Sequence, residues 1–339
     1  MLYFPLQDSI ELLRRLTFRK VWNGIKVFSS YHYSRLSGNA TQWGLPIAVS
    51  LEPTTSCNLR CPECPSGLRS FTRDRGMLQE DLFRRTIETL HKELWYLTFY
   101  FQGEPYLHPK FLEMVNFASQ KGIYTATSTN GHYLNDEKAK MTVLSGLSRL
   151  IISLDGIKQE TYELYRKGGN LEKVIEGIQN IIRWKRELKS KTPKLILQFL
   201  IFKHNETEMS QVIEFGRKLG VDEVRFKTAQ VYDYDRGNTL IPQNEKFSRY
   251  HKQDDGRYAV KNPLPNHCWK LWHSCVITWD GKVVPCCFDK DAKHRLGNLQ
   301  TESFKQVWKS NAYRQFRSSV LRSRKEVDIC TNCTEGLTL

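Results

Sequence analysis

The sequence of 339 residues lacks any run of about 18 uncharged apolar residues, which is the length that a helix needs to cross a bilayer. It also lacks the unbroken apolar stretch of a secretory signal peptide, because Asp8, Glu11, Arg14 and Arg15 interrupt its beginning. No internal repeat or low-complexity tract is present. We therefore expect a cytoplasmic protein without a membrane-spanning helix.

Acidic residues are scarce relative to basic ones. The chain has 36 Asp and Glu residues against 51 Lys and Arg residues, which gives a formal net charge of +15. A positive charge of this size can serve nucleic-acid binding, but the basic residues are spread over many predicted helices and form no known RNA- or DNA-binding motif. The composition therefore argues against a nucleic-acid partner. It equally suits an acidic protein partner, or a substrate that carries phosphate or carboxylate.

Cysteine is absent between residues 65 and 267, although the chain contains nine cysteines. Three lie in the stretch SCNLRCPECPSG, at Cys57, Cys61 and Cys64. The other six follow the gap, as Cys268, Cys275, Cys286, Cys287, Cys330 and Cys333. Disulfides are rare in a reducing cytosol, and the odd number of cysteines also argues against complete pairing. The clustering instead predicts metal ligation or catalysis.

Short β-branched runs alternate with helical patterns through the first two thirds of the chain. The predicted strands lie near residues 46–52, 96–101, 123–129, 150–155, 195–201 and 223–227. Six such alternations predict a parallel sheet with helices outside it. Reactive groups in such sheets collect at the carboxyl ends of the strands, and the first cysteine loop directly follows the first strand.

The sequence divides into four predicted segments. Residues 1–45 form a helical, aromatic and basic segment, which we expect to pack beside the first strand; the alternative is a helix on a membrane surface. Residues 46–232 form the α/β core, and residues 233–267 form a polar connector. Residues 268–339 form a small cysteine-rich module with a predicted hairpin that turns at Asp280-Gly281.

The spacing C-x3-C-x2-C of the first cluster indicates an incomplete set of metal ligands. Three thiolates can each bind one iron of a 4Fe-4S cluster, which leaves the fourth iron without a protein ligand. A structural zinc site would need a fourth ligand nearby, and none of the nine histidines lies in this loop. An ordinary electron-transfer cluster would bring a fourth cysteine. The open position therefore suits a second molecule.

This loop resembles the signature of the radical S-adenosylmethionine (radical SAM) superfamily. The resemblance implies a partial (β/α)6 TIM-like barrel, followed here by a small C-terminal cysteine-rich α+β module. It implies that Cys57, Cys61 and Cys64 hold the catalytic cluster, whose open iron is chelated by the amino and carboxylate groups of S-adenosylmethionine (SAM). In the family, an electron from the reduced cluster cleaves SAM to methionine and a 5′-deoxyadenosyl radical, which abstracts hydrogen from the substrate.

The sequence QGEP after the second predicted strand resembles the GGEP motif of the family. Its backbone is expected to receive the amino group of SAM, at Gly103, Glu104 and Pro105. Gly103 permits close approach of the chain, and Glu104 can accept a hydrogen bond from the ammonium group. Taken alone, QGEP could equally be an ordinary loop. Gln102 replaces the usual first glycine, and Glu63 stands where relatives often have an aromatic residue.

Polar groups at the ends of the next strands complete the expected SAM site. STNG ends the third strand and SLDG ends the fourth, and the resemblance assigns Asn130, Ser153 and Asp155 to contacts with the ribose and carboxylate. Arg166 could pair with the SAM carboxylate, or could be a solvated loop arginine. Gln198 is predicted to face the barrel interior, where a polar side chain needs a partner.

The C-terminal cysteines resemble the Twitch and SPASM extensions of radical SAM enzymes, which bind auxiliary 4Fe-4S clusters. The pattern C-x17-C with a distant C-x2-C implies one auxiliary cluster, because the dense middle cysteine run of a full SPASM module is missing. The implied ligands are Cys268, Cys286, Cys330 and Cys333. Cys275 and Cys287 are then spare, although Cys287 could replace Cys286 as a ligand. A zinc site made by the same four cysteines is the alternative.

The resemblance implies a radical SAM oxidoreductase or maturase. We expect the auxiliary cluster to accept an electron during dehydrogenation or another oxidative modification of a small molecule, with an electron donor such as flavodoxin or ferredoxin. A peptide or protein substrate is the alternative, although 45 residues are few for the recognition domain often fused to such maturases. Epimerisation, with Cys275 or Cys287 returning hydrogen, is a further possibility. Two non-catalytic classes stay open: an iron-sulfur electron carrier and a zinc-stabilised nucleic-acid-binding protein.

Overall fold

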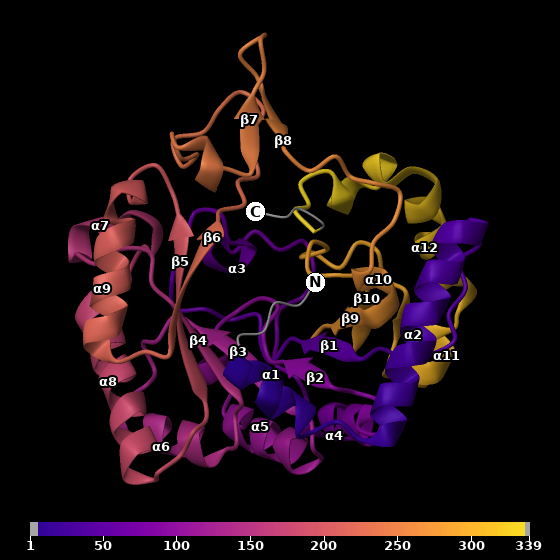
Figure 1. Ribbon diagram of the computed structural model, residues 1–339, viewed down its shortest axis with the longest axis horizontal. Coiled ribbons are helices and arrows are strands. Elements are labelled where there is room, and N and C mark those ends of the chain that lie inside the picture. The colour runs from indigo at the N-terminus through magenta and orange to yellow at the C-terminus, as the bar shows by residue number, and fades with distance from the viewer. Residues whose placement is uncertain (1–5, 336–339) are drawn as a thin grey trace.

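A single open sheet organises the chain, and the computed structural model describes residues 6–335 of it. The strands lie in the order β11-β10-β9-β1-β2-β3-β4-β5-β6, so β11 and β6 are the free edges and the barrel is partial (Figure 1). The first six strands are parallel to their neighbours. They are β1 (Ala48–Leu51), β2 (Tyr96–Thr98), β3 (Tyr124–Thr129), β4 (Arg149–Ser153), β5 (Lys194–Ile201) and β6 (Glu223–Thr228). This arrangement confirms the predicted α/β class.

Helices cover the outer face of the parallel strands (Figure 1). They are α4 (Glu80–Leu90), α5 (Phe111–Gln120), α6 (Asp136–Leu144), α7 (Gln159–Tyr165), α8 (Leu171–Glu187) and α9 (Met209–Leu219). Alternate residues of each strand pack against these helices, as Leu195, Leu197 and Phe199 of β5 do in the main hydrophobic core. The residues between them, Gln198 among these, therefore face the interior of the barrel.

The C-terminal hairpin extends the same sheet. Strand β9 (Ser274–Ile277) pairs in parallel with β1, and β10 (Lys282–Val284) then pairs antiparallel with β9. The short strand β11 (Gly297–Asn298) completes this edge. The turn lies where the sequence predicts it, because the Gly281 N–H donates to the Thr278 carbonyl at 3.0 Å. The pairing of β9 with β1 could not be predicted, because it joins segments more than 200 residues apart.

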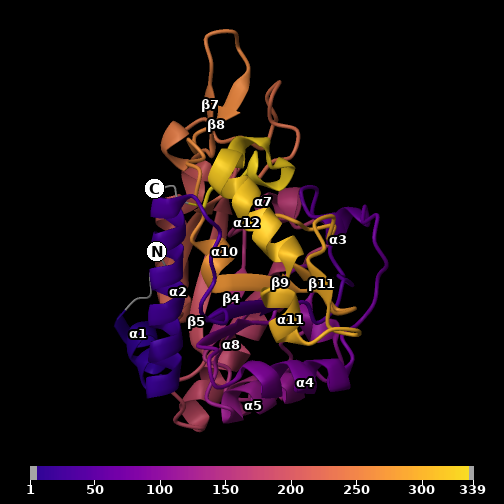
Figure 2. The same cartoon turned by 90° about the vertical axis from the view of Figure 1, so that its right-hand side faces the viewer.

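The remaining elements are short or lie at the ends of the chain. The helices are α3 (Pro65–Leu68), α10 (Lys270–His273), α11 (Phe304–Trp308) and α12 (Asn311–Ser323). Single 3-10 turns occur at Pro105–Leu107, Glu206–Glu208, Glu245–Phe247, Arg324–Glu326 and Asp328–Cys330. The predicted connector contains a hairpin, β7 (Tyr250–Lys252) and β8 (Tyr258–Val260), that projects from the body (Figures 1 and 2). The outer ends of the two terminal segments, residues 1–5 and 336–339, lie outside the described residues.

The N-terminal helices α1 (Leu6–Leu13) and α2 (Phe18–Ser37) lie together along one side of the sheet (Figure 2). Helix α2 begins at a cap in which Thr17 accepts from the Lys20 N–H, and it ends at Gly38 with φ of 73°. Its Asn23 side chain bonds both the N–H and the carbonyl of Leu45, just before β1. This contact places α2 beside the first strand. None of the described helices is long and apolar enough to cross a membrane.

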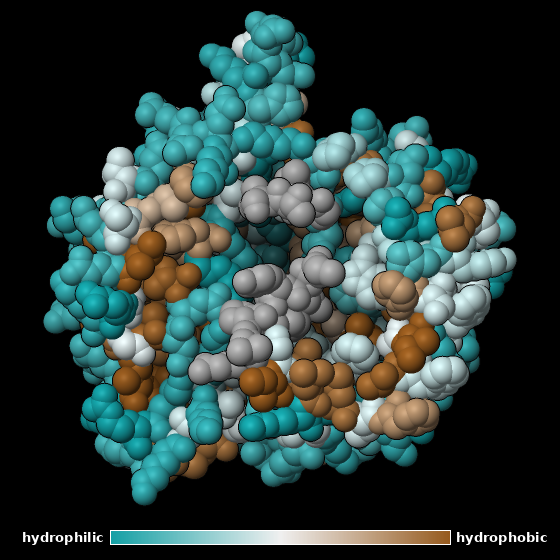
Figure 3. Space-filling model, viewed as in Figure 1, coloured by the Kyte–Doolittle hydropathy of each residue, from teal (hydrophilic) through white to brown (hydrophobic). Residues whose placement is uncertain are grey.

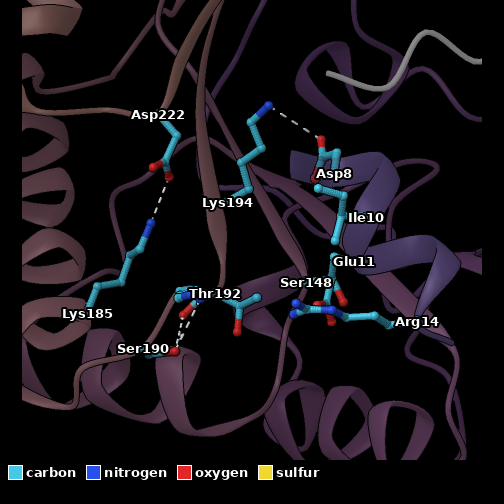
Figure 4. Close-up of a pocket in the computed structure, with 11 residues that line it drawn as sticks. Asp8, Ile10, Glu11, Arg14, Ser148, Lys185, Ser190, Thr192, Lys194 and Asp222 are labelled. Carbon is cyan, nitrogen blue, oxygen red and sulfur yellow. Dashed lines mark hydrogen bonds and ion pairs between the residues drawn. The ribbon is translucent and has the colours of Figure 1, made fainter. Parts of the chain in front are cut away.

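Ion pairs occupy the amino ends of the parallel strands. Asp8 of α1 accepts from the Tyr124 hydroxyl at 2.5 Å and from Arg149 at 2.6 Å, at the starts of β3 and β4. A nearby cavity of about 470 Å³ is lined by acidic and basic side chains, among them Asp8, Lys194 and Asp222. Figure 4 shows Lys194 directed toward Asp8 and Lys185 toward Asp222. This polar cavity therefore lies at the end of the barrel opposite to the cysteine loop.

A buried ion pair joins the core to the C-terminal hairpin. The Arg73 guanidinium donates two hydrogen bonds to the Glu52 carboxylate, at 2.8 and 2.6 Å, and both side chains are almost fully buried. The Trp279 N–H, in the turn between β9 and β10, donates to the same carboxylate at 3.2 Å. The pair thus fixes the end of β1 against the hairpin.

We expect Arg73→Met to destabilise the holoprotein by about 3 to 5 kcal/mol, because it leaves the Glu52 carboxylate buried without its cation. Arg84→Met is the matched control, since Arg84 pairs with Glu80 at the surface and such pairs contribute about 1 kcal/mol or less. Anaerobic urea unfolding followed by tryptophan fluorescence measures both. Equal midpoints for the two variants would contradict the structural role of the buried pair.

Candidate active site

The three cysteines of the first loop lie together just beyond the carboxyl end of β1. They pack with Leu59 and Phe202 in one small cluster. The pKa of Cys57 is raised to about 12 and that of Cys61 to about 11, mainly by burial and in smaller part by the neighbouring thiols. The thiols are therefore close to one another and poorly hydrated, so they become thiolates only when a metal replaces their protons.

Hydrogen-bond donors surround these sulfur atoms. The Leu59 N–H lies 3.5 Å from Cys57 Sγ, the Asn130 amide nitrogen lies 4.0 Å from the same sulfur, and Arg166 lies 3.9 Å from Cys61 Sγ. Such donors stabilise metal-bound thiolates and serve no purpose around inert buried cysteines. Among residues 6–335 no three His, Cys, Asp or Glu side chains are grouped to hold a single metal ion. A 4Fe-4S cluster is larger than a single ion and binds one thiolate per iron, so the three cysteines fit three of its four irons.

The QGEP segment packs directly against the cysteine loop. Gly103 has φ of +75°, and a Cβ atom there would lie 2.1 Å from the Thr54 carbonyl oxygen. The Gly103 N–H donates to Ser66 Oγ at 2.8 Å, and the Glu104 N–H donates to the Ser56 carbonyl at 2.7 Å. Only glycine fits this approach, so QGEP is held closely against the cysteine loop.

Glu104 is bonded to the end of β3. Its carboxylate accepts from the Thr129 hydroxyl at 2.7 Å and from the Asn130 N–H at 2.8 Å. Burial raises the pKa of Glu104 to about 7, although these hydrogen bonds oppose the rise. Both carboxylate oxygens are therefore engaged within the chain. Pro105 follows as the first residue of a 3-10 turn.

Three of the polar residues predicted at the strand ends lie in neighbouring positions. The Asn130 amide donates to Asn58 Oδ1 at 2.8 Å, beside Cys57. The Ser153 hydroxyl lies 3.3 Å from that of Ser128, and Ser153 is opposite Gln198 in the register of β4 and β5. These groups form a polar row at the carboxyl ends of β3, β4 and β5.

Arg166 forms a buried ion pair with Asp155. The guanidinium Nε donates to Asp155 Oδ2 at 2.5 Å, and only 13% of the Arg166 side chain is exposed. Asp155 also accepts from the Leu200 N–H at 2.8 Å. Burial raises the pKa of Asp155, and the Arg166 charge opposes that rise. The alternative of a solvated loop arginine is therefore wrong, because Arg166 divides its charge between Asp155 and the Cys61 sulfur.

The structure adds three supporting residues that the sequence did not indicate. Asn58 and Ser66 hold the cysteine loop to Asn130 and Gly103, and their position beside the cysteines was the only available signal. The Asn205 amide donates to the carbonyls of Asp155 and Leu200, both at 2.9 Å. No sequence pattern marks Asn205, because its role depends on how two strand ends meet.

The second set of thiols lies in the C-terminal module. Burial raises the pKa of Cys268, and nearby Cys333 raises it too; Cys286 is affected in the same way by burial and then by Cys287 and Cys268. Arg324 is buried and lies 3.3 Å from Cys333 Sγ. Cys330 is close to Cys333, whose N–H donates to the Cys330 carbonyl at 3.0 Å. A cation beside these sulfurs again fits metal-bound thiolates.

The two remaining cysteines have different surroundings. Cys275 is fully buried in the main core beside Ile277, where burial raises its pKa to about 12, so it packs as a small apolar residue. Cys287 is half-buried and acts electrostatically on Lys227 and Tyr100.

Three cations, Lys227, Arg249 and Lys290, gather at the carboxyl end of β6 and are called the interior cations below. Burial, and then the charge of neighbouring Arg225, lower the pKa of Lys227 to about 8. Arg249 donates to the Thr228 carbonyl, and one terminal nitrogen of its guanidinium is buried without a hydrogen-bond partner among residues 6–335. Lys290 donates to Gln230 Oε1 at 3.1 Å. Among the described residues none of the three forms an ion pair with a carboxylate.

Two protein-family models match the chain. The radical SAM superfamily model matches residues 51–215, and the SPASM iron-sulfur cluster-binding domain matches residues 268–334. The chain belongs to the radical SAM superfamily. This radical SAM enzyme therefore binds a 4Fe-4S cluster and SAM in its barrel, and its SPASM domain binds auxiliary iron-sulfur. The matches confirm the family, the partial barrel and the cofactors that the two cysteine patterns predict.

Curated relatives align over most of the enzyme. It is 27% identical over 317 residues to the tungsten-containing aldehyde ferredoxin oxidoreductase cofactor-modifying protein of Pyrococcus furiosus, which covers 84% of this chain and 86% of that protein. It is 24% identical over 308 residues to the PqqA peptide cyclase of Rhodopseudomonas palustris, covering 83% and 78%. It is 25% identical over 313 residues to the mycofactocin maturase of Mycobacterium ulcerans, covering 85% and 80%.

Solved structures share the fold. SuiB of Streptococcus suis bound to SAM superposes with a TM-score of 0.63 at 13% identity, covering 87% of this chain and 73% of that chain. The SAM-bound enzyme anSMEcpe superposes with a TM-score of 0.61 at 18% identity, covering 82% and 81%. At these identities the likeness establishes the common fold alone.

We expect Gly103→Ala to lower SAM cleavage about a hundredfold, because the added Cβ pushes QGEP away from the cysteine loop. Gly122→Ala is the matched control: Gly122 also has positive φ, at +71°, but no atom lies within 4 Å of its added Cβ. The measurement is 5′-deoxyadenosine formation after dithionite reduction, normalised to iron content. Equal activity of both variants would show that the close approach at Gly103 does not matter.

Proposed function

We propose that the enzyme oxidises a small molecule by two electrons in the barrel interior, between the SAM-binding cluster and the SPASM domain. The observation that carries this proposal is the position of the interior cations. Burial lowers the pKa of Lys290, and the thiols of Cys64 and Cys287, one from each cysteine set, oppose that change. Arg249 donates to the Thr228 carbonyl at the end of β6, and burial lowers its pKa while Cys333 and Cys287 oppose that change. A substrate held there would reach both metal sites.

Residues of the chain have separate tasks in this proposal. Cys57, Cys61 and Cys64 hold the catalytic cluster, and Arg166 balances charge at Cys61. The amino group of SAM would meet the QGEP backbone at Gly103, Glu104 and Pro105, and its ribose and carboxylate would meet the polar row with Asp155–Arg166 behind it. When bound, the reduced cluster and SAM supply one electron and a hydrogen-atom acceptor.

The proposed oxidation balances as follows. The substrate gives one hydrogen atom to the fragment of SAM that leaves as 5′-deoxyadenosine, and methionine is the other product. The substrate would then lose one proton to solvent and one electron, which an auxiliary cluster held by Cys268, Cys286, Cys330 and Cys333 could accept. An external donor such as flavodoxin or ferredoxin supplies the electron that starts each turnover. The net change in the substrate is the loss of two electrons and two protons, as in dehydrogenation of an alcohol.

We further propose that Cys268, Cys286, Cys330 and Cys333 ligate one auxiliary cluster, and that Cys287 does not. Cys286 acts electrostatically on Tyr313 of the C-terminal module and is itself affected by Cys268, whereas Cys287 acts on the interior cations. Cys286 begins a turn in which the Asp289 N–H donates to the Cys286 carbonyl at 3.2 Å, and Cys287 lies inside that turn.

The substrate is proposed to carry a carboxylate or phosphate group. Arg249 is half-buried, and one terminal nitrogen of its guanidinium has no hydrogen-bond partner in the described part of the chain, which an anion would supply. Lys227 is exposed, and among residues 6–335 neither side chain forms an ion pair with a carboxylate. The auxiliary thiols have their own cation, because Arg324 donates directly to Cys333. The interior cations are therefore free to pair with a substrate anion.

A peptide substrate is the second candidate. The names of two relatives, PqqA peptide cyclase and mycofactocin maturase, favour it. In the described residues only α1 and α2 precede the barrel, so a peptide would have to be presented by another protein or bind directly to the mouth of the barrel.

We expect Cys57→Ala to remove about half of the iron, from about eight atoms to about four per chain, and to abolish 5′-deoxyadenosine formation. Cys333→Ala should remove a similar amount of iron, yet retain reductive cleavage of SAM, because the catalytic cluster stays. Cys287→Ala should keep all the iron, unlike Cys286→Ala. Iron analysis with electron paramagnetic resonance of the anaerobic proteins measures this. Retained cleavage in Cys57→Ala would refute the proposed function.

We expect Lys227→Met to weaken binding of inorganic pyrophosphate to the holoenzyme at least about tenfold, because a charge-assisted contact is lost. Lys305→Met, at an exposed position of α11, is the control and should bind pyrophosphate as the unmodified enzyme does. Anaerobic calorimetric titration measures both. Equal binding by the two variants would refute the anionic substrate group without affecting the proposed oxidation.

A further inference from the structure

Helix α2 exposes large apolar side chains to solvent and buries a largely polar or small face, which is the reverse of an ordinary surface helix. Its buried face is largely polar or small, and consists of Lys20, Asn23, Gly24, Val27, Ser30, Tyr31 and Ser34. Its exposed face carries large apolar side chains: Phe18, Val21, Trp22, Ile25, Phe28 and Leu36. Phe18 and Leu36, at the two ends, are 86% and 90% exposed. A surface helix normally turns its apolar stripe toward the core.

Specific contacts hold α2 in this orientation. The Lys20 ammonium donates to the Gly122 carbonyl at 2.6 Å, and Asn23 bonds both backbone groups of Leu45. Gly24 lies against the Trp95 ring, where a Cβ atom would come within 2.4 Å of a ring carbon. The indole N–H of Trp95 also donates to the Lys20 carbonyl at 2.9 Å. Rotating the helix to bury its apolar face would break every one of these contacts.

The exposed apolar surface continues beyond α2. Ile10 and Leu13 of α1 are 42% and 62% exposed, and Trp43, which follows α2, is 48% exposed. In Figure 3 brown surface appears in the region that α1 and the start of α2 occupy in Figure 1. Single exposed apolar residues are ordinary, but a contiguous group of this kind marks a surface that contacts something else.

The basic residues around this apolar surface indicate what kind of partner it contacts. No Asp or Glu occurs between Glu11 and Glu52. The basic residues of the same segment are Arg14, Arg15, Arg19, Lys20, Lys26 and Arg35. Lys26 extends over the ring of Trp22, with its ammonium 5.7 Å from the ring centre, so a cation borders the apolar stripe directly. Arg15 pairs with Glu11 and Arg19 with Glu93, whereas Arg14, Lys26 and Arg35 form no ion pair among residues 6–335. An apolar surface bordered by such cations is complementary to an anionic lipid bilayer.

We propose that α2 binds the surface of an anionic lipid membrane, lying in the plane of the interface with Phe18, Trp22 and Ile25 inserted among the acyl chains. Trp22, Trp43 and Tyr33 are half exposed on this segment, and such amphipathic rings favour the headgroup level of a bilayer. The helix lies on the surface and does not span the membrane. A protein partner would need acidic groups around an apolar groove, whereas anionic lipid supplies both properties at once. The proposal does not depend on the proposed reaction.

The test is flotation of the anaerobic holoenzyme with lipid vesicles. One set contains phosphatidylcholine alone, and the other contains about one third phosphatidylserine. The test variant is Phe18→Glu/Ile25→Glu, which places charge in the stripe. The control is Ile213→Glu, at a position of α9 that is 54% exposed and far from α2 in the chain. Formation of 5′-deoxyadenosine reports that each variant is folded, because α2 contributes no residue to the site.

We expect the unmodified enzyme and Ile213→Glu to float with the anionic vesicles and Phe18→Glu/Ile25→Glu to bind them at least about tenfold more weakly. High salt should release the enzyme, because the lysine and arginine contribution is screened. Equal flotation with neutral vesicles would overturn the requirement for anionic lipid. Absence of flotation would overturn the proposal; a concentration-dependent dimer that the double variant abolishes would then assign the stripe to a second copy of the chain.

Discussion

The parallel pairing of β9 with β1 is the contact on which the rest of the molecule depends. Ala48 lies opposite Ser274 in this pairing, so the hairpin that precedes Cys286 and Cys287 begins beside the strand that precedes the Cys57 loop. Hydrogen bonds between strands are directional and leave little freedom of register. Two cysteine sets separated by about 200 residues of sequence are thereby held on one sheet, with the barrel interior between them. The Glu52–Arg73 pair strengthens the same junction.

Charge placement then gives the interior its character. At the amino ends of the strands, Asp8 forms an ion pair with Arg149, so the charge of each is neutralised within the chain. At the carboxyl ends, Asp155 restrains Arg166 beside a cysteine sulfur. Lys227 and Arg249, at the carboxyl end of β6, have no such counterion among residues 6–335. The same barrel thus has one end built for stability and another suited to bind negatively charged groups.

At α2 the outer surface of the protein is apolar rather than charged. Polar contacts with Trp95 and Leu45 fix the inner face of this helix, so the apolar residues of its outer face stay exposed. Burial of the stripe by a lipid surface would recover the hydrophobic free energy that folding alone leaves unused.

The sequence by itself determined the class of fold, the family and the two cysteine sets, because strand periodicity and cysteine spacing are local properties of the chain. It also located the hairpin turn at Asp280-Gly281 and the interior position of Gln198. Only the tertiary structure revealed the β9–β1 pairing, the Asp155–Arg166 ion pair, the convergence of Lys227, Arg249 and Lys290, and the outward apolar face of α2. Each of these depends on which distant segments meet and on how an element is rotated about its axis, and no local pattern encodes either.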